Sequence, residues 1–122
     1  MSLGKILIID DDKAVREVVN LLLSSEGFDV IEAIDGEDGY KKIIVDKPDL
    51  ILLDIIMPKI NGYILLNKIT QDNELKNIPV ILLTATSQMA GNISLKSHSV
   101  DNIHKPFEPD DLINKIKKKL IK

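Results

Sequence analysis

The stretch KILIIDDD, residues 5–12, joins a short apolar run to three consecutive aspartates. The run Ile6 to Ile9 contains only isoleucine and leucine and is too short for a buried helix, so it predicts a β-strand. The run is apolar throughout rather than alternating, which is typical of a strand that helices cover on both faces. It therefore indicates a parallel sheet, with the aspartates placed where the strand ends.

Further short runs repeat this pattern along the chain. Strands are predicted at Asp29–Ala33, Leu50–Leu53 and Val80–Leu83, and a weaker one at Asn102–His104. The last run is less apolar, as the edge of a sheet permits.

Apolar residues at helical spacing predict helices between these strands. Their stripes are, in chain order, Val15, Val18, Val19, Leu22 and Leu23; Tyr40, Ile43 and Ile44; Tyr63, Leu65, Leu66 and Ile69; and Leu112, Ile113, Ile116 and Leu120. Asp12 is a suitable N-cap for the first helix, and Gly27 a suitable stop. Pro48 closes the second helix and Pro109 opens the last. A short fourth helix is expected between Thr86 and Ser99.

Alternating strands and helices predict an open, doubly wound α/β sheet with five parallel strands. A chain of 122 residues, 44% apolar, has the size and composition of one domain. We therefore expect a single domain over residues 1–122, with residues 1–4 an expression remnant or a disordered N-terminus. Ligands of such sheets bind outside the carboxyl ends of the strands.

Composition excludes several classes of function. The net charge of -3 and the 3% aromatic content argue against direct nucleic-acid binding. The absence of cysteine excludes disulfides, thiolate metal sites and a cysteine nucleophile. The apolar runs are too short for membrane insertion or a signal peptide, so a cytoplasmic location is expected.

The predicted strand ends carry the residues that can do chemistry. Asp10 to Asp12 follow the first strand, Asp54 the third, Thr84 the fourth and Lys105 the fifth. Carboxylates gathered at one edge repel one another unless a cation joins them, and a few hard oxygen ligands favour Mg²⁺. One carboxylate could then attack phosphorus, while an ammonium group and a hydroxyl take up the charge on the transferred oxygens. The pattern indicates phosphoryl transfer to an aspartate.

Four motifs in this order resemble the receiver domain of two-component response regulators, the CheY-like family. They are Lys5 to Asp12 with Arg16; Asp54-Ile55-Ile56-Met57-Pro58 with Gly62; Leu83-Thr84-Ala85; and Lys105-Pro106-Phe107. The resemblance runs from about Lys5 to Lys119. It implies a flavodoxin-like sheet with strand order 2-1-3-4-5 and helices on both faces.

The resemblance also implies a role for each site residue. Asp54 would be the phosphoacceptor. Mg²⁺ would be bound directly by Asp11, Asp54 and the carbonyl of Ile56, and through water by Asp10. The phosphoryl group would contact Lys105, the Thr84 hydroxyl and the Ala85 amide. The Lys105–Pro106 peptide would be cis, an isomer that is accessible before proline.

The partners implied are a sensor histidine kinase or phosphotransfer protein as donor and a downstream protein target that the sequence does not identify. A homodimer is compatible with the family. The domain would catalyse its own phosphorylation and its own dephosphorylation. The dephosphorylation would be slow, because Ile56 and Thr86 stand at the two positions that orient the attacking water in this family, and neither side chain can do so well.

Asn102 stands where receivers commonly carry a switching tyrosine or phenylalanine. This departure keeps open an alternative function, a receiver-like interaction module that works without phosphorylation. A phosphatase that passes through an aspartyl phosphate is a further alternative. It is disfavoured because Ile56 occupies the position of the second acid that such enzymes commonly use.

Overall fold

The computed structural model describes residues 2–55, 62–84 and 100–120. Its centre is a five-stranded sheet in the order β2-β1-β3-β4-β5, in which every neighbouring pair is parallel. The strands are β1 (Lys5–Ile9), β2 (Asp29–Ala33), β3 (Leu50–Asp54), β4 (Val80–Thr84) and β5 (Val100–His104). The predicted fold class and strand order are confirmed, with the weaker fifth strand at an edge.

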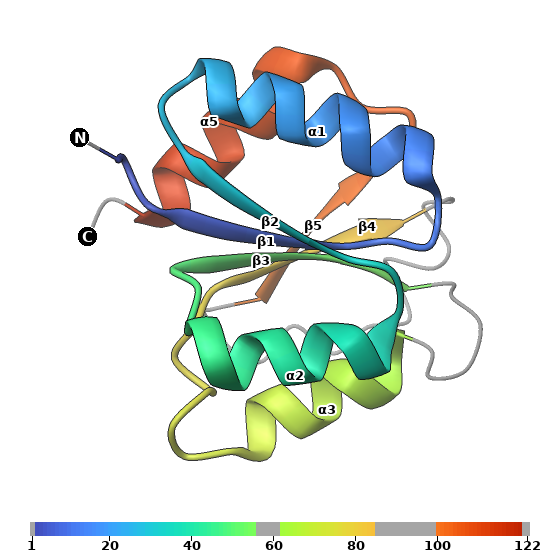
Figure 1. The fold of residues 1–122 in the computed structure, drawn as a ribbon, viewed down its shortest axis with the longest axis vertical. Helices are drawn as coiled ribbons and strands as arrows, with labels where there is room; N and C mark the ends of the chain where they lie inside the picture. The colour runs from blue at the N-terminus through green and yellow to red at the C-terminus, as the bar shows by residue number, and fades with distance from the viewer. Residues whose placement is uncertain (1, 56–61, 85–99, 121–122) are drawn as a thin grey trace.

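Helices cover both faces of the sheet (Figure 1). One face carries α1 (Lys13–Ser25) and α5 (Pro109–Leu120), and the other carries α2 (Gly36–Asp46) and α3 (Gly62–Gln71). The helix expected between Thr86 and Ser99 lies outside the described residues.

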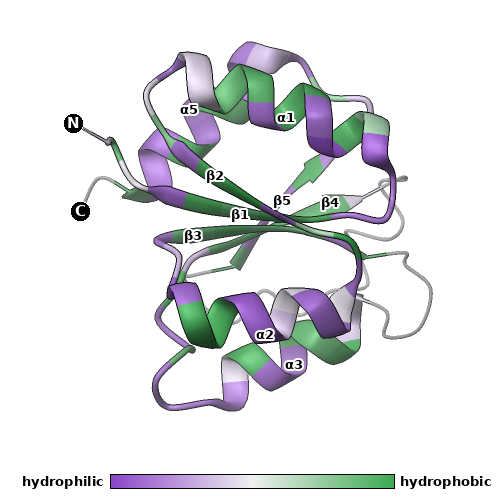
Figure 2. Cartoon of the chain, in the orientation of Figure 1, coloured by the Kyte–Doolittle hydropathy of each residue, from purple (hydrophilic) through white to green (hydrophobic). Residues whose placement is uncertain are grey.

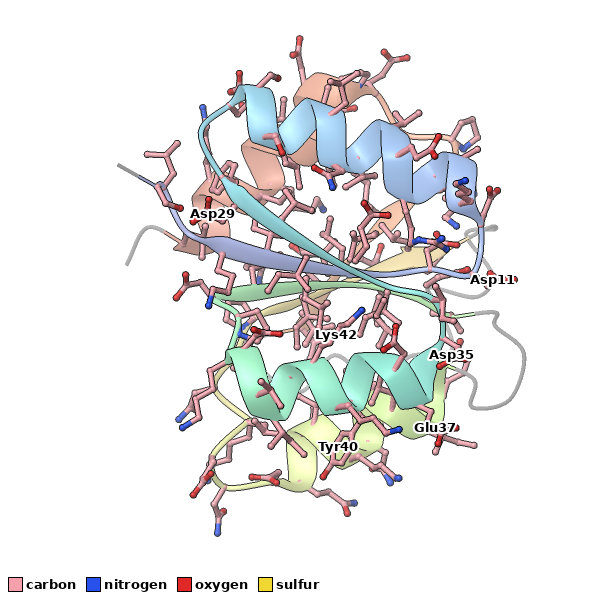
Figure 3. The ribbon with its side chains drawn as sticks, in the orientation of Figure 1. Asp11, Asp29, Asp35, Glu37, Tyr40 and Lys42 are labelled. Carbon is pink, nitrogen blue, oxygen red and sulfur yellow. The ribbon has the colours of Figure 1, made fainter. Side chains whose placement is uncertain are left out.

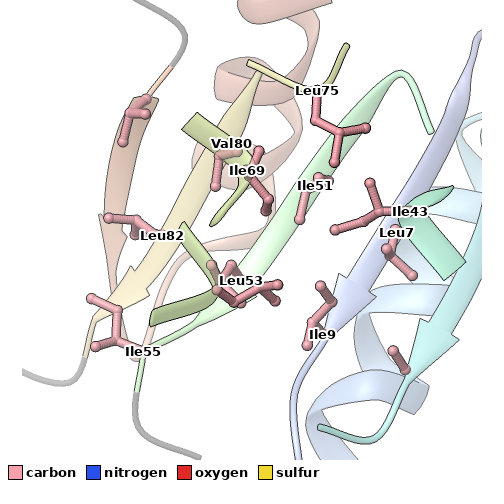
Figure 4. Close-up of a cluster of buried hydrophobic side chains, with 13 residues drawn as sticks. Leu7, Ile9, Ile43, Ile51, Leu53, Ile55, Ile69, Leu75, Val80 and Leu82 are labelled. Carbon is pink, nitrogen blue, oxygen red and sulfur yellow. The ribbon is translucent and has the colours of Figure 1, made fainter. Parts of the chain in front are cut away.

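Successive side chains of the central strands supply two separate cores. Leu7 and Ile9 of β1 face the core beneath α2 and α3, while Ile6 and Ile8 face the core beneath α1 and α5. The first core, drawn in Figure 4, also contains Ile43, Ile51, Leu53, Ile55, Leu65, Ile69, Leu75, Val80 and Leu82. Figure 2 shows mainly apolar strands between helices that carry both polar and apolar residues. Burial on both faces explains why these strands are continuously apolar.

The ends of the helices follow the signals in the sequence. The Asp12 side chain accepts a hydrogen bond from the Ala14 amide (2.9 Å) and caps α1. Gly27 has a φ of 102°, a conformation that favours glycine, just beyond the end of that helix. The amide of Leu3 donates to the Gly27 carbonyl (2.9 Å) and joins the N-terminal segment to this turn.

Three residues of the predicted apolar stripes are exposed, Tyr63 of α3 at 38% and two others more strongly. Val18 of α1 is 59% exposed and Ile44 of α2 is 49% exposed. Val18 precedes the fully buried Val19, and Ile44 follows the fully buried Ile43. Adjacent positions of a helix differ by about 100° around its axis, so one can face the sheet while the next faces solvent. The helices therefore bury a narrower arc than the apolar residues suggest. The fifth strand also begins at Val100, two residues before its predicted start.

Gly62 fixes the position at which α3 begins. Its amide donates to the Ile55 carbonyl (2.7 Å), and a Cβ at Gly62 would lie 2.5 Å from the Ile55 Cα and 2.6 Å from the Asp54 carbonyl oxygen. We expect Gly62→Ala to lower the free energy of unfolding by about 3 kcal/mol, despite alanine's higher helix propensity, because backbone atoms cannot move aside easily. Urea unfolding measures this change, and unaltered stability would show that the contact is not as close as described.

Candidate functional site

The register of β1 and β3 brings two predicted acids to the same edge of the sheet. Ile9, the last residue of β1, is paired with Leu53 of β3, and the next residues along the chain are Asp10 and Asp54. Asp11 lies at the turn from β1 into α1, at this carboxyl edge (Figure 3). Side chains from separate parts of the sequence therefore meet because the strands are parallel and aligned.

The next two strands carry the remaining predicted residues to this edge. Leu83 of β4 is paired with Asp54, so Thr84 lies one step further along. Thr84 is paired with His104 of β5, and Lys105 follows directly. The backbone amide of Lys105 donates to the Thr84 carbonyl (2.7 Å), which continues the sheet pairing beyond β5.

Three carboxylates converge at this edge. Asp10, Asp11 and Asp54 each offer one oxygen, and these oxygens lie within 4.8 Å of one another. Asp10 and Asp54 are buried, whereas Asp11 is exposed. Three negative charges so close repel one another, and a cation shared among them would offset the repulsion. Hard oxygen donors of this kind suit Mg²⁺ or Ca²⁺.

Lys105 supplies a positive charge to the same cluster. Its Nζ lies 3.0 Å from Oδ2 of Asp10 and 3.7 Å from Oδ1 of Asp54. The Asp10 side chain is fully buried, and the Lys105 side chain is 25% exposed. The peptide between Lys105 and Pro106 is cis, as predicted. The ammonium group is thus held between two acids that come from different strands.

Thr84 is buried at the end of β4, and its hydroxyl donates to the carbonyl of Ile103 (3.3 Å). A contact between this hydroxyl and a group on Asp54 would require it to turn away from β5. Ile56 and Ala85, two further residues of the predicted site, lie outside the described residues.

Arg16 and Glu32 contact the site, although the sequence assigned neither of them a role in it. Nη1 of Arg16 donates to the backbone carbonyl of Asp10 (2.8 Å), and Nε donates to Oε1 of Glu32 (3.2 Å). Arg16 belongs to one of the recognised motifs, but its contact to Asp10 is visible only in three dimensions. Nothing in the sequence indicated a role for Glu32, because a single acidic residue is common in an edge strand of a sheet.

Fold and site together define a class. This is a doubly wound α/β protein with an acidic cluster that could bind a metal, and a lysine beside it, at the carboxyl ends of its strands. That is the edge at which open α/β sheets bind their ligands.

Comparisons with known proteins identify the family within this class. The model of the response regulator receiver domain matches residues 6–117. The DNA-binding dual master transcriptional regulator RpaA of Synechocystis is 35% identical over 93% of this chain and 47% of its own length. The phosphate regulon transcriptional regulatory protein PhoB of Pseudomonas aeruginosa is 35% identical over 92% of this chain and 49% of its own length. The chain belongs to the receiver domain family of two-component response regulators.

Solved structures agree with this assignment. The chemotaxis protein CheY4 of Vibrio cholerae superposes with a TM-score of 0.87 at 26% identity, covering 98% of this chain and 100% of that one. The receiver domain of a signal transduction histidine kinase from Syntrophus aciditrophicus gives a TM-score of 0.87 at 28% identity, covering 96% and 89%.

The chain spans about half the length of the curated relatives it matches. What those relatives do as whole proteins is therefore not carried over to it. Within the described ranges, none of the helices is long and apolar enough to cross a membrane.

Proposed function

We propose that this receiver domain accepts a phosphoryl group on Asp54 from the phosphohistidine of a sensor histidine kinase or phosphotransfer protein. The convergence of Asp10, Asp11 and Asp54 with the Lys105 ammonium is the observation that carries the proposal. In this arrangement, a nucleophilic Asp54 carboxylate would lie beside groups that can compensate the charge of a phosphoryl oxygen.

The reaction transfers one phosphoryl group between two side chains. An oxygen of the Asp54 carboxylate attacks phosphorus, and the bond between phosphorus and the donor imidazole nitrogen breaks. The electron pair of that bond stays on the imidazole, and the product is an acyl phosphate on Asp54. Lys105, already 3.7 Å from Asp54, would pair with the oxygens of the transferred group. The Thr84 hydroxyl and the Ala85 amide would donate hydrogen bonds to them.

The described acids fit a resident Mg²⁺. Asp11 and Asp54 would bind it directly together with the carbonyl of Ile56, and Asp10 would bind it through water. The ion supplies positive charge against the phosphoryl oxygens. Asp10 has a second role in this arrangement, because its buried carboxylate holds the Lys105 ammonium at 3.0 Å and so aims it toward Asp54.

Phosphorylation would act as a switch by adding negative charge beside Lys105 and Thr84. A phosphoryl group competes for the Thr84 hydroxyl, which now donates to Ile103 of β5. Loss of that hydrogen bond would favour a different arrangement of β5 and the adjoining helix face. Asn102, which stands in place of the usual aromatic residue, lies on this strand. The changed face would then bind a downstream protein, and its identity and homodimerisation stay predictions.

Acetyl phosphate, a small donor, tests the proposed function without a kinase. We expect the protein to gain the mass of one phosphoryl group in the presence of Mg²⁺ and none in the presence of EDTA. Failure to label under both conditions would favour the alternative function, an interaction module that works without phosphorylation. Repeated turnover of small phosphate esters would favour a phosphatase.

We expect the phosphorylated protein to lose its phosphoryl group slowly, over many minutes or longer, in Mg²⁺ without an added phosphatase. Neither Ile56 nor Thr86 carries a carboxylate or amide that could orient the attacking water. Intact mass measured over time after removal of acetyl phosphate gives the half-life. A half-life of seconds would contradict this expectation and would point to another group that activates water.

A further inference from the structure

Arg16 connects the acidic cluster to the edge of the sheet, and we propose that it is a positioning residue for the metal site. It holds the Asp10–Asp11 peptide in the orientation that Mg²⁺ requires, and Glu32 holds Arg16 in turn. This inference rests on the proposed function, because it concerns the same metal site. It adds two residues that lie outside the acidic cluster.

The peptide between Asp10 and Asp11 is held through its carbonyl oxygen, and Asp10 is held further through its own amide, which donates to the Ala33 carbonyl (3.2 Å). Arg16 donates to the Asp10 carbonyl oxygen from Nη1 (2.8 Å), and the Asp10 side chain accepts from the Asp12 amide (2.9 Å). Because a peptide unit is planar, fixing the carbonyl also fixes the amide and Cα of Asp11. Among these contacts, the hydrogen bond from Arg16 is the one made to the peptide that leads into Asp11, so it helps to set the direction in which the exposed Asp11 carboxylate leaves the backbone.

The guanidinium group makes two directed contacts at once. Arg16 is only 12% exposed, and its Nε donates to Glu32 (3.2 Å) while Nη1 reaches Asp10. The planar, rigid fork of arginine suits this geometry, whereas a lysine ammonium is a single point charge on a flexible stem. A lysine at this position could keep the charge but not both contacts.

Glu32 is itself held by both neighbouring helices. Its Oε2 accepts from Nδ2 of Asn20 in α1 (2.8 Å), and its backbone carbonyl accepts from Nζ of Lys42 in α2. Figure 3 shows Lys42 reaching from α2 toward the sheet. Glu32 is therefore a fixed support for Arg16 rather than a mobile surface acid.

Charge and position predict opposite effects when Arg16 is replaced. Removing a positive charge near three carboxylates should, by electrostatics alone, strengthen the binding of a divalent cation. Loosening the peptide that carries Asp11 should weaken it. A loss of affinity in Arg16→Gln therefore identifies positioning, and Arg16→Lys tests the same point with the charge retained.

The experiment compares Mg²⁺ dissociation constants by calorimetry for the wild type, R16Q, R16K, E32Q and K13Q. We expect Kd to rise about tenfold in R16Q and R16K, as it does when outer-shell partners of a metal ligand are removed. E32Q should change Kd in the same direction by less. K13Q is the matched control, since Lys13 lies in the same helix and its exposed side chain pairs with Glu17. It removes the same charge and should not weaken binding.

Ca²⁺ gives a readout that general destabilisation does not produce. Mg²⁺ demands nearly ideal octahedral geometry, whereas Ca²⁺ accepts flexible coordination, so a loosened Asp11 should cost more Mg²⁺ affinity than Ca²⁺ affinity. We expect the ratio of the Mg²⁺ to the Ca²⁺ dissociation constant to rise in R16Q and R16K. Thermal unfolding in EDTA shows that each variant is folded at the temperature of the titration.

The outcomes separate this inference from the proposed function. Wild-type protein that fails to bind Mg²⁺ would overturn the metal site and both proposals together. Wild-type binding with unchanged or tighter binding in R16Q and R16K would overturn only the role of Arg16. Equal losses for Mg²⁺ and Ca²⁺ would also overturn it, because they would indicate a general effect on the fold.

Discussion

Replacement of Asp54 by asparagine is expected to abolish phosphorylation by acetyl phosphate. The asparagine amide has the shape of the carboxylate but lacks the charged oxygen that attacks phosphorus. The replacement also removes one of the three carboxylates at the carboxyl edge. Intact-mass spectrometry should show the wild-type protein with one added phosphoryl group and the D54N protein with none above background.

Asp12→Asn is the matched control for this loss. Asp12 is an exposed acid next to Asp11 in the chain, and its side chain caps α1. Asparagine caps helices equally well. The D12N protein should therefore label like the wild type. Equal labelling of D54N and wild type would show that another residue accepts the phosphoryl group, and the proposed role of Asp54 would be wrong.

Replacement of Lys105 by methionine is expected to lower the free energy of unfolding by about 3 kcal/mol in EDTA, because it leaves the buried Asp10 without its charged partner. Methionine keeps much of the side-chain volume, so packing loss contributes little. Mg²⁺ should restore much of this stability, since a bound cation replaces the missing charge and stabilises the folded state by mass action. Urea unfolding with and without Mg²⁺ measures both effects.

Lys117→Met provides the comparison for a surface ion pair. Lys117 contacts Glu26 at 3.1 Å, but both side chains are exposed, and such pairs contribute about 1 kcal/mol at most. K117M should therefore lose far less stability than K105M, and Mg²⁺ should not compensate for the loss. If both variants lose equally little, Lys105 does not neutralise the cluster as the structure indicates.

Most of the fold follows from the sequence because its central strands are unusually clear. Helices bury β1, β3 and β4 on both faces, so the continuous apolar runs give the strands and their parallel pairing. The convergence of Asp10, Asp54 and Lys105 then follows from topology, since parallel strands end at one edge. Their roles come from the family resemblance and stay predictions until measured.

Contacts between elements were harder to predict. The pairing of Arg16 with Glu32 joins a helix to an edge strand, and neither residue belongs to an apolar pattern that fixes its partner. The exposure of Val18 was not predicted either. The hydropathy pattern gives the spacing of apolar residues along a helix, but not the width of the arc that the sheet covers. Such details depend on the angle at which helix and sheet pack.

Direct mapping of the phosphorylated residue tests the central claim. Borohydride reduces an acyl phosphate on aspartate to homoserine, so protein treated with acetyl phosphate and Mg²⁺ can be reduced, digested and sequenced by mass spectrometry. We predict homoserine at position 54, and none when EDTA replaces Mg²⁺. Homoserine at position 10, 11 or 12 instead, or phosphorylation that does not require a divalent cation, would contradict the proposed site.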